Sequence, residues 1–182
     1  MNNRTFCLVG LFALAFGSSP AAASEDPKVL TKRAVDCARR GHWAEAVQPL
    51  RRAARRDPAL ALAHHDLGVV LAQQGSYEEA LASLQRALEL EDLADTHEAL
   101  GLTLLHLDRN EEALAEYDVA RRGGRSSAPT LFNRALALER LGRLGQAENA
   151  YREALAAEAS FAPARAAIVR LSGEGAAHAL VR

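Results

Sequence analysis

Histidines and cysteines are the side chains in this 182-residue sequence best suited to metal or nucleophile chemistry. The six histidines are His42, His64, His65, His97, His106 and His178. Metal sites on helices favour ligands three or four positions apart with an acid nearby, and no two of these histidines have that spacing. His64 and His65 are adjacent, so they point in different directions on a helix. Packing or surface roles are therefore favoured over metal binding, and no cofactor is expected.

No catalytic motif accompanies these residues. Gly123 and Gly124 lie between two predicted helices, without the preceding strand and the following lysine of a phosphate-binding loop. No serine stands in the strand–turn–helix context of a nucleophile elbow. The arginine- and glycine-rich segment 121–125 lacks the interleaved aromatic residues of a nucleic-acid-binding tract. We therefore expect neither an enzyme nor a nucleic-acid partner.

Residues 1–23 have the features of a secretory signal peptide. Arg4 supplies a positive charge, an apolar run covers 6–16, and small residues precede a cleavage point after Ala23. The run of about 11 apolar residues is well short of the roughly 20 that span a bilayer. We expect an exported protein, periplasmic or secreted, without a stable membrane span after cleavage.

A period of 33 or 34 residues organises the rest of the chain. Small residues recur at Ala46, Ala80, Ala113 and Ala147, and large ones at Leu50, Leu84, Tyr117 and Tyr151. The segment before each of these carries a small residue, at Ala34, Gly68, Gly101 and Ala135 in the successive repeats. Three residues later it carries Cys37, Leu71, Leu104 and Leu138. The position between the two segments is held by Gly41, Gly75, Asp108 and Gly142. Apolar steps of three and four residues on both sides of this position predict helix–turn–helix units.

This pattern resembles the tetratricopeptide repeat, and the resemblance implies an all-α solenoid of about four such units spanning 24–171. The units lie near 27–60, 61–93, 94–127 and 128–161, and a capping helix at 163–171 and a flexible tail at 172–182 follow. Ser76 and Glu79 predict a capping box at the start of one helix. Asn110 is expected to serve as the N-cap of another.

Cys37 is the single thiol of the expected mature chain, because Cys7 lies in the predicted signal peptide. An intramolecular disulfide is then impossible. Cys37 occupies a repeat position held elsewhere by leucine, which favours a core thiol over a redox role.

Charge is distributed unevenly along the chain. Residues 24–60 carry a net charge of +4, residues 61–127 carry −8, and residues 128–182 carry +2. The arginines of 51–56 predict a solvated helix face, with a docking patch for an anionic partner or lipid surface as the alternative.

In the tetratricopeptide repeat family the first helices of successive units line a concave groove that commonly holds a peptide or a partner helix. By position, the resemblance assigns partner binding to Val35, Leu62, His65, Val69, Glu98, Leu102, Leu105, Phe132 and Leu136. An apolar floor with acids concentrated in the third unit favours an amphipathic or basic–apolar peptide. Two alternatives stay open: these side chains cover one another, or the segment 178–182 folds back into the groove.

The resulting interpretation is a non-catalytic scaffold or adaptor in the cell envelope that binds a peptide or helix of a partner protein. The alternative is a structural subunit of an envelope or secretion assembly that self-associates through its end helices or its arginine-rich face. A third hypothesis is an enzyme accessory that carries metal through its histidines. Fold alone does not separate them, because one fold hosts many functions.

Overall fold

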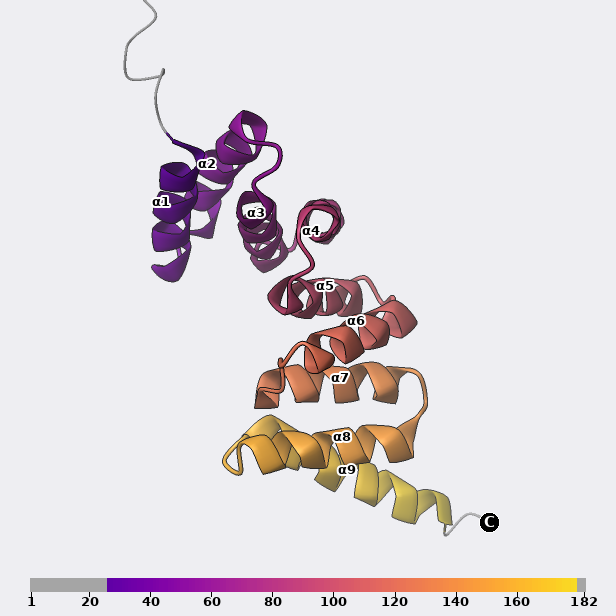
Figure 1. The fold of residues 1–182 in the computed structure, drawn as a ribbon. Helices are drawn as coiled ribbons and strands as arrows, with labels where there is room; N and C mark the ends of the chain where they lie inside the picture. The colour runs from indigo at the N-terminus through magenta and orange to yellow at the C-terminus, as the bar shows by residue number, and fades with distance from the viewer. Residues whose placement is uncertain (1–25, 180–182) are drawn as a thin grey trace, which may run out of the picture.

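The computed structural model describes residues 26–179, and this part of the chain consists of α-helices joined by short turns. The helices are α1 (Pro27–Arg39), α2 (Trp43–Arg56), α3 (Ala61–Gln73), α4 (Tyr77–Leu90), α5 (Ala94–His106), α6 (Asn110–Arg122), α7 (Ala128–Arg140), α8 (Leu144–Ala157) and α9 (Ala162–Ala179). Antiparallel pairs stack one after another, with α1 and α9 at opposite ends of the stack (Figure 1). The predicted all-α solenoid is confirmed. The predicted signal peptide at 1–23 lies outside the described residues.

In every helix pair, one residue of the turn between the two helices has the left-handed backbone conformation. Its φ is 83° at Gly41, 80° at Gly75, 58° at Asp108 and 72° at Gly142. The next backbone amide donates to a carbonyl in the last turn of the first helix, in the bonds His42–Cys37, Ser76–Leu71, Arg109–Leu104 and Arg143–Leu138. These bonds satisfy carbonyls that the end of a helix leaves unpaired, so the sequence period becomes a repeated helix stop.

Two capping predictions are wrong. Ser76 is the N-cap of α4 but its side chain makes no capping bond, and Glu79 pairs with the guanidinium of Arg51 on α2. A charge-assisted bond of this kind is stronger than a neutral one. Arg109, not Asn110, is the N-cap of α6, and Asn110 Nδ2 donates to Asp108 Oδ1 at 2.9 Å. Among the four turns inside helix pairs, the turn at Asp108 is the one without glycine, and Asn110 thus stabilises it.

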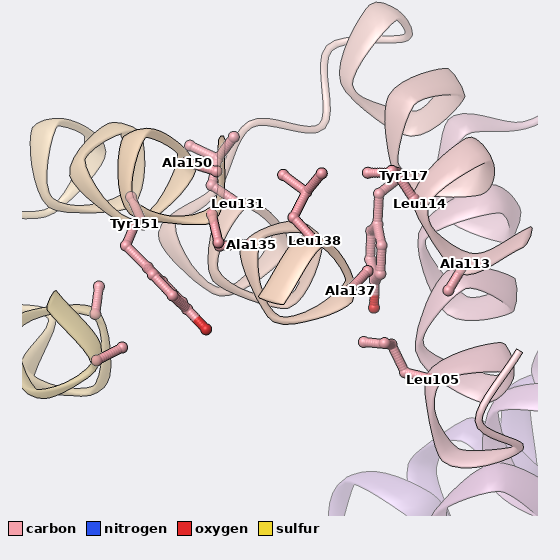
Figure 2. Close-up of a cluster of buried hydrophobic side chains, with 14 of the residues drawn as sticks. Leu105, Ala113, Leu114, Tyr117, Leu131, Ala135, Ala137, Leu138, Ala150 and Tyr151 are labelled. Carbon is pink, nitrogen blue, oxygen red and sulfur yellow. The ribbon is translucent and has the colours of Figure 1, made fainter. Parts of the chain in front are cut away.

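The core lies between the two helices of each pair and between neighbouring pairs. The repeated alanines and the large residues one turn later are fully buried, namely Ala46, Ala80, Ala113, Ala147, Leu50, Leu84, Tyr117 and Tyr151. Figure 2 shows Leu131, Ala135 and Leu138 of α7 between the rings of Tyr117 and Tyr151. Two of the large residues lie directly against glycines, Leu84 against Gly68 and Tyr117 against Gly101.

The C-terminal helix is longer than the sequence predicts. Instead of a capping helix at 163–171 and a break at 172–175, α9 continues to Ala179. The helix contains two glycines, Gly173 and Gly175, each of which costs only about 1 kcal/mol relative to alanine, and no proline follows them in α9 to stop the helix. Residues 172–179 of the predicted flexible tail form the last turns of α9, and 180–182 lie outside the described residues. Ala164, Ala167 and Leu171 are buried and close the end of the core.

Within 26–179, no helix combines the length and the apolar character that crossing a bilayer requires. Cys37 is half-buried beside Trp43 and the core of the first two pairs. Arg40 Nη2 donates to its Sγ at 3.6 Å.

Candidate functional site

The first helices of the four pairs lie side by side on the inner face of the solenoid. α1 contacts α3, α3 contacts α5, and α5 contacts α7, while the second helices make no comparable contacts with one another among the described residues. Val35, Val69, Leu102 and Leu136 hold the same repeat position on these helices, and each is half-buried. We call these four residues the apolar stripe. It leaves one partly exposed apolar side chain on each inner helix.

A pocket of about 560 Å³ opens at the N-terminal end of the apolar stripe, and we call it the α1–α3 pocket. Its lining consists of Lys28, Thr31, Lys32, Val35, Asp36, Arg39, Leu60, Leu62 and Asp66. Val35, Leu60 and Leu62 form its apolar part, and Leu62 is 51% exposed. Two of the predicted partner-binding residues, Val35 and Leu62, therefore line one open cavity.

Asp66 is the polar residue of this pocket with an unmet hydrogen-bonding need. Its Oδ2 is shielded from solvent and has no hydrogen-bond partner. Burial raises the pKa of Asp66 to about 6, against the opposing positive charge of Arg39. Asp66 is not among the residues predicted for the site from the sequence. The available signal was its position one turn after Leu62, which puts both residues on one helix face.

The predicted site residues His65 and Glu98 are held by neighbouring helices. His65 Nδ1 lies 3.0 Å from Thr96 Oγ1, and burial followed by the charge of Arg125 lowers the pKa of His65. The Thr130 hydroxyl donates to Glu98, and Arg125 pairs with Asp95 and lies 4.0 Å from Glu98. The acids expected at the groove edge of the third unit are therefore paired within the protein.

Leu105 and Phe132 face the core more than the groove. Leu105 is only 3% exposed, and Arg140 Nη1 donates to its backbone carbonyl at 2.6 Å. Leu105 is predicted to bind the partner, but its side chain lies in the core together with Tyr117 (Figure 2). The half-buried Phe132 ring lies 5.3 Å from the Tyr151 ring and 5.7 Å from the Phe161 ring. It links α7 to α8 and to the residue just before α9.

His97 joins two acids on opposite sides of its ring. Nδ1 lies 2.5 Å from Glu116 Oε2 and Nε2 lies 2.7 Å from Asp92 Oδ1. Although burial opposes protonation, these two bonds raise the pKa of His97 above its ordinary value. The imidazole thus ties the loop before α5 to α6. Among the described residues, no group of three or more His, Cys, Asp or Glu side chains is arranged to hold a metal ion.

Comparisons with known proteins agree with this architecture. Two family profiles described as tetratricopeptide repeat match residues 31–97 and 128–161, together more than half of the chain. No curated protein matches the chain.

Among solved structures, MamA from Desulfovibrio magneticus RS-1 is 19% identical with a TM-score of 0.77, over 86% of this chain and 89% of that one. YrrB, described as a tetratricopeptide repeat protein with an unusual peptide-binding site, is 20% identical with a TM-score of 0.73, over 88% and 84%. The type IV pilus biogenesis factor PilW is 24% identical with a TM-score of 0.70, over 78% and 66%. Identities this low show the fold alone. With its helix pairs, turns and core in the same period, the chain belongs to the tetratricopeptide repeat family.

Proposed function

We propose that this protein is a non-catalytic scaffold that holds a peptide or helix of a partner protein against its concave face. The observation that carries the proposal is the apolar stripe together with the α1–α3 pocket, which leaves apolar side chains partly open to solvent on one face. Grooves of this kind bind segments that present apolar anchors at regular intervals. YrrB, with a similar fold, is described as having a peptide-binding site, which supports the same role here.

The proposal includes a place of action in the cell envelope, supported by the signal-like features of residues 1–23. A protein exported without an intramolecular disulfide depends on its packed core for stability. The buried columns of alanine, leucine and tyrosine provide such a core. The scaffold is therefore suited to holding a partner outside the cytoplasm.

The test introduces charge into the apolar stripe. The double variant Val69→Glu, Leu102→Glu is expected to lose capture of the partner, because an apolar segment cannot bury two carboxylates without partners. A pull-down from envelope extract followed by mass spectrometry identifies the partner. Titration with the purified partner then measures how far the double variant loses affinity for it.

The matched control is the double variant Leu144→Glu, Val169→Glu, which charges two apolar residues that are 49% and 67% exposed outside the stripe. It should capture the partner as the parent does. Helical content from circular dichroism must be the same in all three proteins. Undiminished capture by the stripe variant would refute the concave face as the binding site.

A further inference from the structure

The α1–α3 pocket carries two lysines at one end and two carboxylates beside Arg39 at the other. Lys28 and Lys32 stand one turn apart on the pocket-facing side of α1, and Asp36 follows one turn later. Asp66 lies at the Asp36 end, where the charge of Arg39 reaches it. At 1.5 Å per residue, the centre of the lysine pair is about 9 Å along the helix from Asp36.

The charged groups at both ends lack partners in the protein. Within the described part of the chain, no side chain pairs with Lys28, Lys32 or Asp36, and Asp66 Oδ2 accepts no hydrogen bond. By contrast, the acids of the third unit are satisfied by Arg125 and Thr130. Burial without a hydrogen-bond donor makes the ionised carboxylate of Asp66 unfavourable, so a cation that a ligand brings beside it gains more there than at a paired acid.

The apolar part of the pocket lies between these ends. Val35, Leu60 and Leu62 together offer a surface for one aliphatic side chain. An extended peptide advances about 3.3 Å per residue, so a span of about 9 Å corresponds to about three residues. The distance between the charged ends of the pocket therefore sets the number of peptide residues that separate the acidic and the basic side chain of the ligand.

We propose that the α1–α3 pocket recognises an extended peptide in which an acidic and a basic residue stand about three positions apart with an apolar residue between them. The basic side chain lies against Asp36 and Asp66, and the acidic side chain lies against Lys28 and Lys32. This inference rests on the proposed function and adds the chemistry of the partner segment.

The test uses fluorescein-labelled, capped decapeptides of glycine and serine that carry one glutamate, one leucine and one lysine. The lysine stands two to six positions from the glutamate, and the leucine lies between them. Fluorescence anisotropy with the full chain measures affinity. The peptide with a spacing of three should bind at least tenfold more tightly than counterparts with two glutamates or two lysines. Equal binding of all charge patterns, or no binding of any peptide, would overturn the proposal.

Two variants of the pocket locate the contacts. Asp66→Asn should weaken binding of the mixed-charge peptide about tenfold, since it removes the charge that faces the lysine. Lys32→Glu should weaken the same peptide and strengthen the peptide with two lysines. Asp118→Asn is the matched control. Asp118 does not line the pocket, and its Oδ1 is paired with Arg134 Nε at a distance of 2.6 Å. If both pocket variants bind as the parent does, the proposed chemistry is wrong.

The pH dependence gives a second readout. The pocket presents Lys28, Lys32, Asp36 and Arg39 from α1 and Asp66 from α3 as its charged groups. A basic ligand favours ionised Asp66, so affinity should fall about tenfold from pH 7.5 to pH 5, and this fall should be absent in Asp66→Asn. Persistence of the fall in Asp66→Asn would contradict the assignment.

Failure of this proposal can be distinguished from failure of the proposed function. The stripe variant Val69→Glu, Leu102→Glu changes residues that do not line the α1–α3 pocket. Loss of partner capture in that variant, with no preference among the charged peptides, would retain the scaffold and reject the mixed-charge segment.

Discussion

At the scale of single residues, Asp66 connects stability to the pocket. Its side chain is half-buried, and its Oδ2 is without a hydrogen-bond partner. Its pKa is raised from 3.8 to about 6, so between these values the unfolded chain loses its proton while the folded chain keeps it. Stability therefore falls as pH rises through this window, and the full penalty is present above pH 6.

The variant Asp66→Asn should remove this penalty. At pH 7 its free energy of unfolding should exceed that of the parent by about 1 kcal/mol, a value discounted for the exposed part of the side chain. Near pH 4 the difference should largely disappear, because the carboxyl is then protonated in the folded chain and close to its midpoint in the unfolded chain. Urea unfolding at the two pH values measures the effect. A less stable variant at pH 7 would show that Asp66 is satisfied in solution.

At the scale of the helices, glycine has opposite roles at two positions. A Cβ on Gly68 of α3 would lie 2.5 Å from Leu84 Cγ and 3.1 Å from the Ala80 carbonyl oxygen, so α3 and α4 cross closely there. A Cβ on Gly173 of α9 would meet nothing within 4 Å. The first glycine permits close packing, and the second only weakens a helix.

The two alanine substitutions should therefore differ in sign. Gly68→Ala is expected to lower stability by about 1–3 kcal/mol through overpacking against Leu84. Gly173→Ala should raise it by up to about 1 kcal/mol through helix propensity. Thermal unfolding followed by circular dichroism measures both. A neutral or destabilising Gly173→Ala would indicate that α9 does not continue through this position in solution.

At the scale of the whole molecule, the buried residues divide along the solenoid. One cluster joins the first two helix pairs and contains Leu50, and a larger one extends from Leu84 to α9 and contains Tyr151. Each pair contacts mainly its neighbours in sequence. In such arrays stability is close to a sum of unit and interface contributions, so damage to one end should stay partly local.

Leu50→Ala should cost about 2–5 kcal/mol by leaving a cavity between α1, α2 and α3. Hydrogen exchange should show a greater loss of protection in α1–α3 than in α7–α9. The control Tyr151→Ala, at an equally buried position of the last pair, should give the reverse pattern. Equal loss along the whole chain in both variants would mean that the solenoid unfolds as one cooperative unit.

The sequence alone predicts the fold because the information that specifies it is local and repeated. Helix periodicity identifies the pairs, and the left-handed position at Gly41, Gly75, Asp108 and Gly142 stops the first helix each time. The columns of small and large residues identify the core, since the same contact recurs in every unit. Each signal falls within about 35 residues, so no long-range information is needed to read it.

The candidate site depends on what adjacent units place against each inner residue, and only the tertiary structure decides this. Leu105 shares the apolar character of Leu102, yet Arg140 and Tyr117 enclose it. Glu98 is paired across helices, whereas Asp66 has an oxygen with no partner. An exposed position and a covered one can therefore carry the same type of residue, as Leu102 and Leu105 do, or an acid in both cases, as Asp66 and Glu98 do. The difference arises from side chains of neighbouring helices, such as Arg140 beside Leu105 and Thr130 beside Glu98, and the repeat pattern does not specify these contacts.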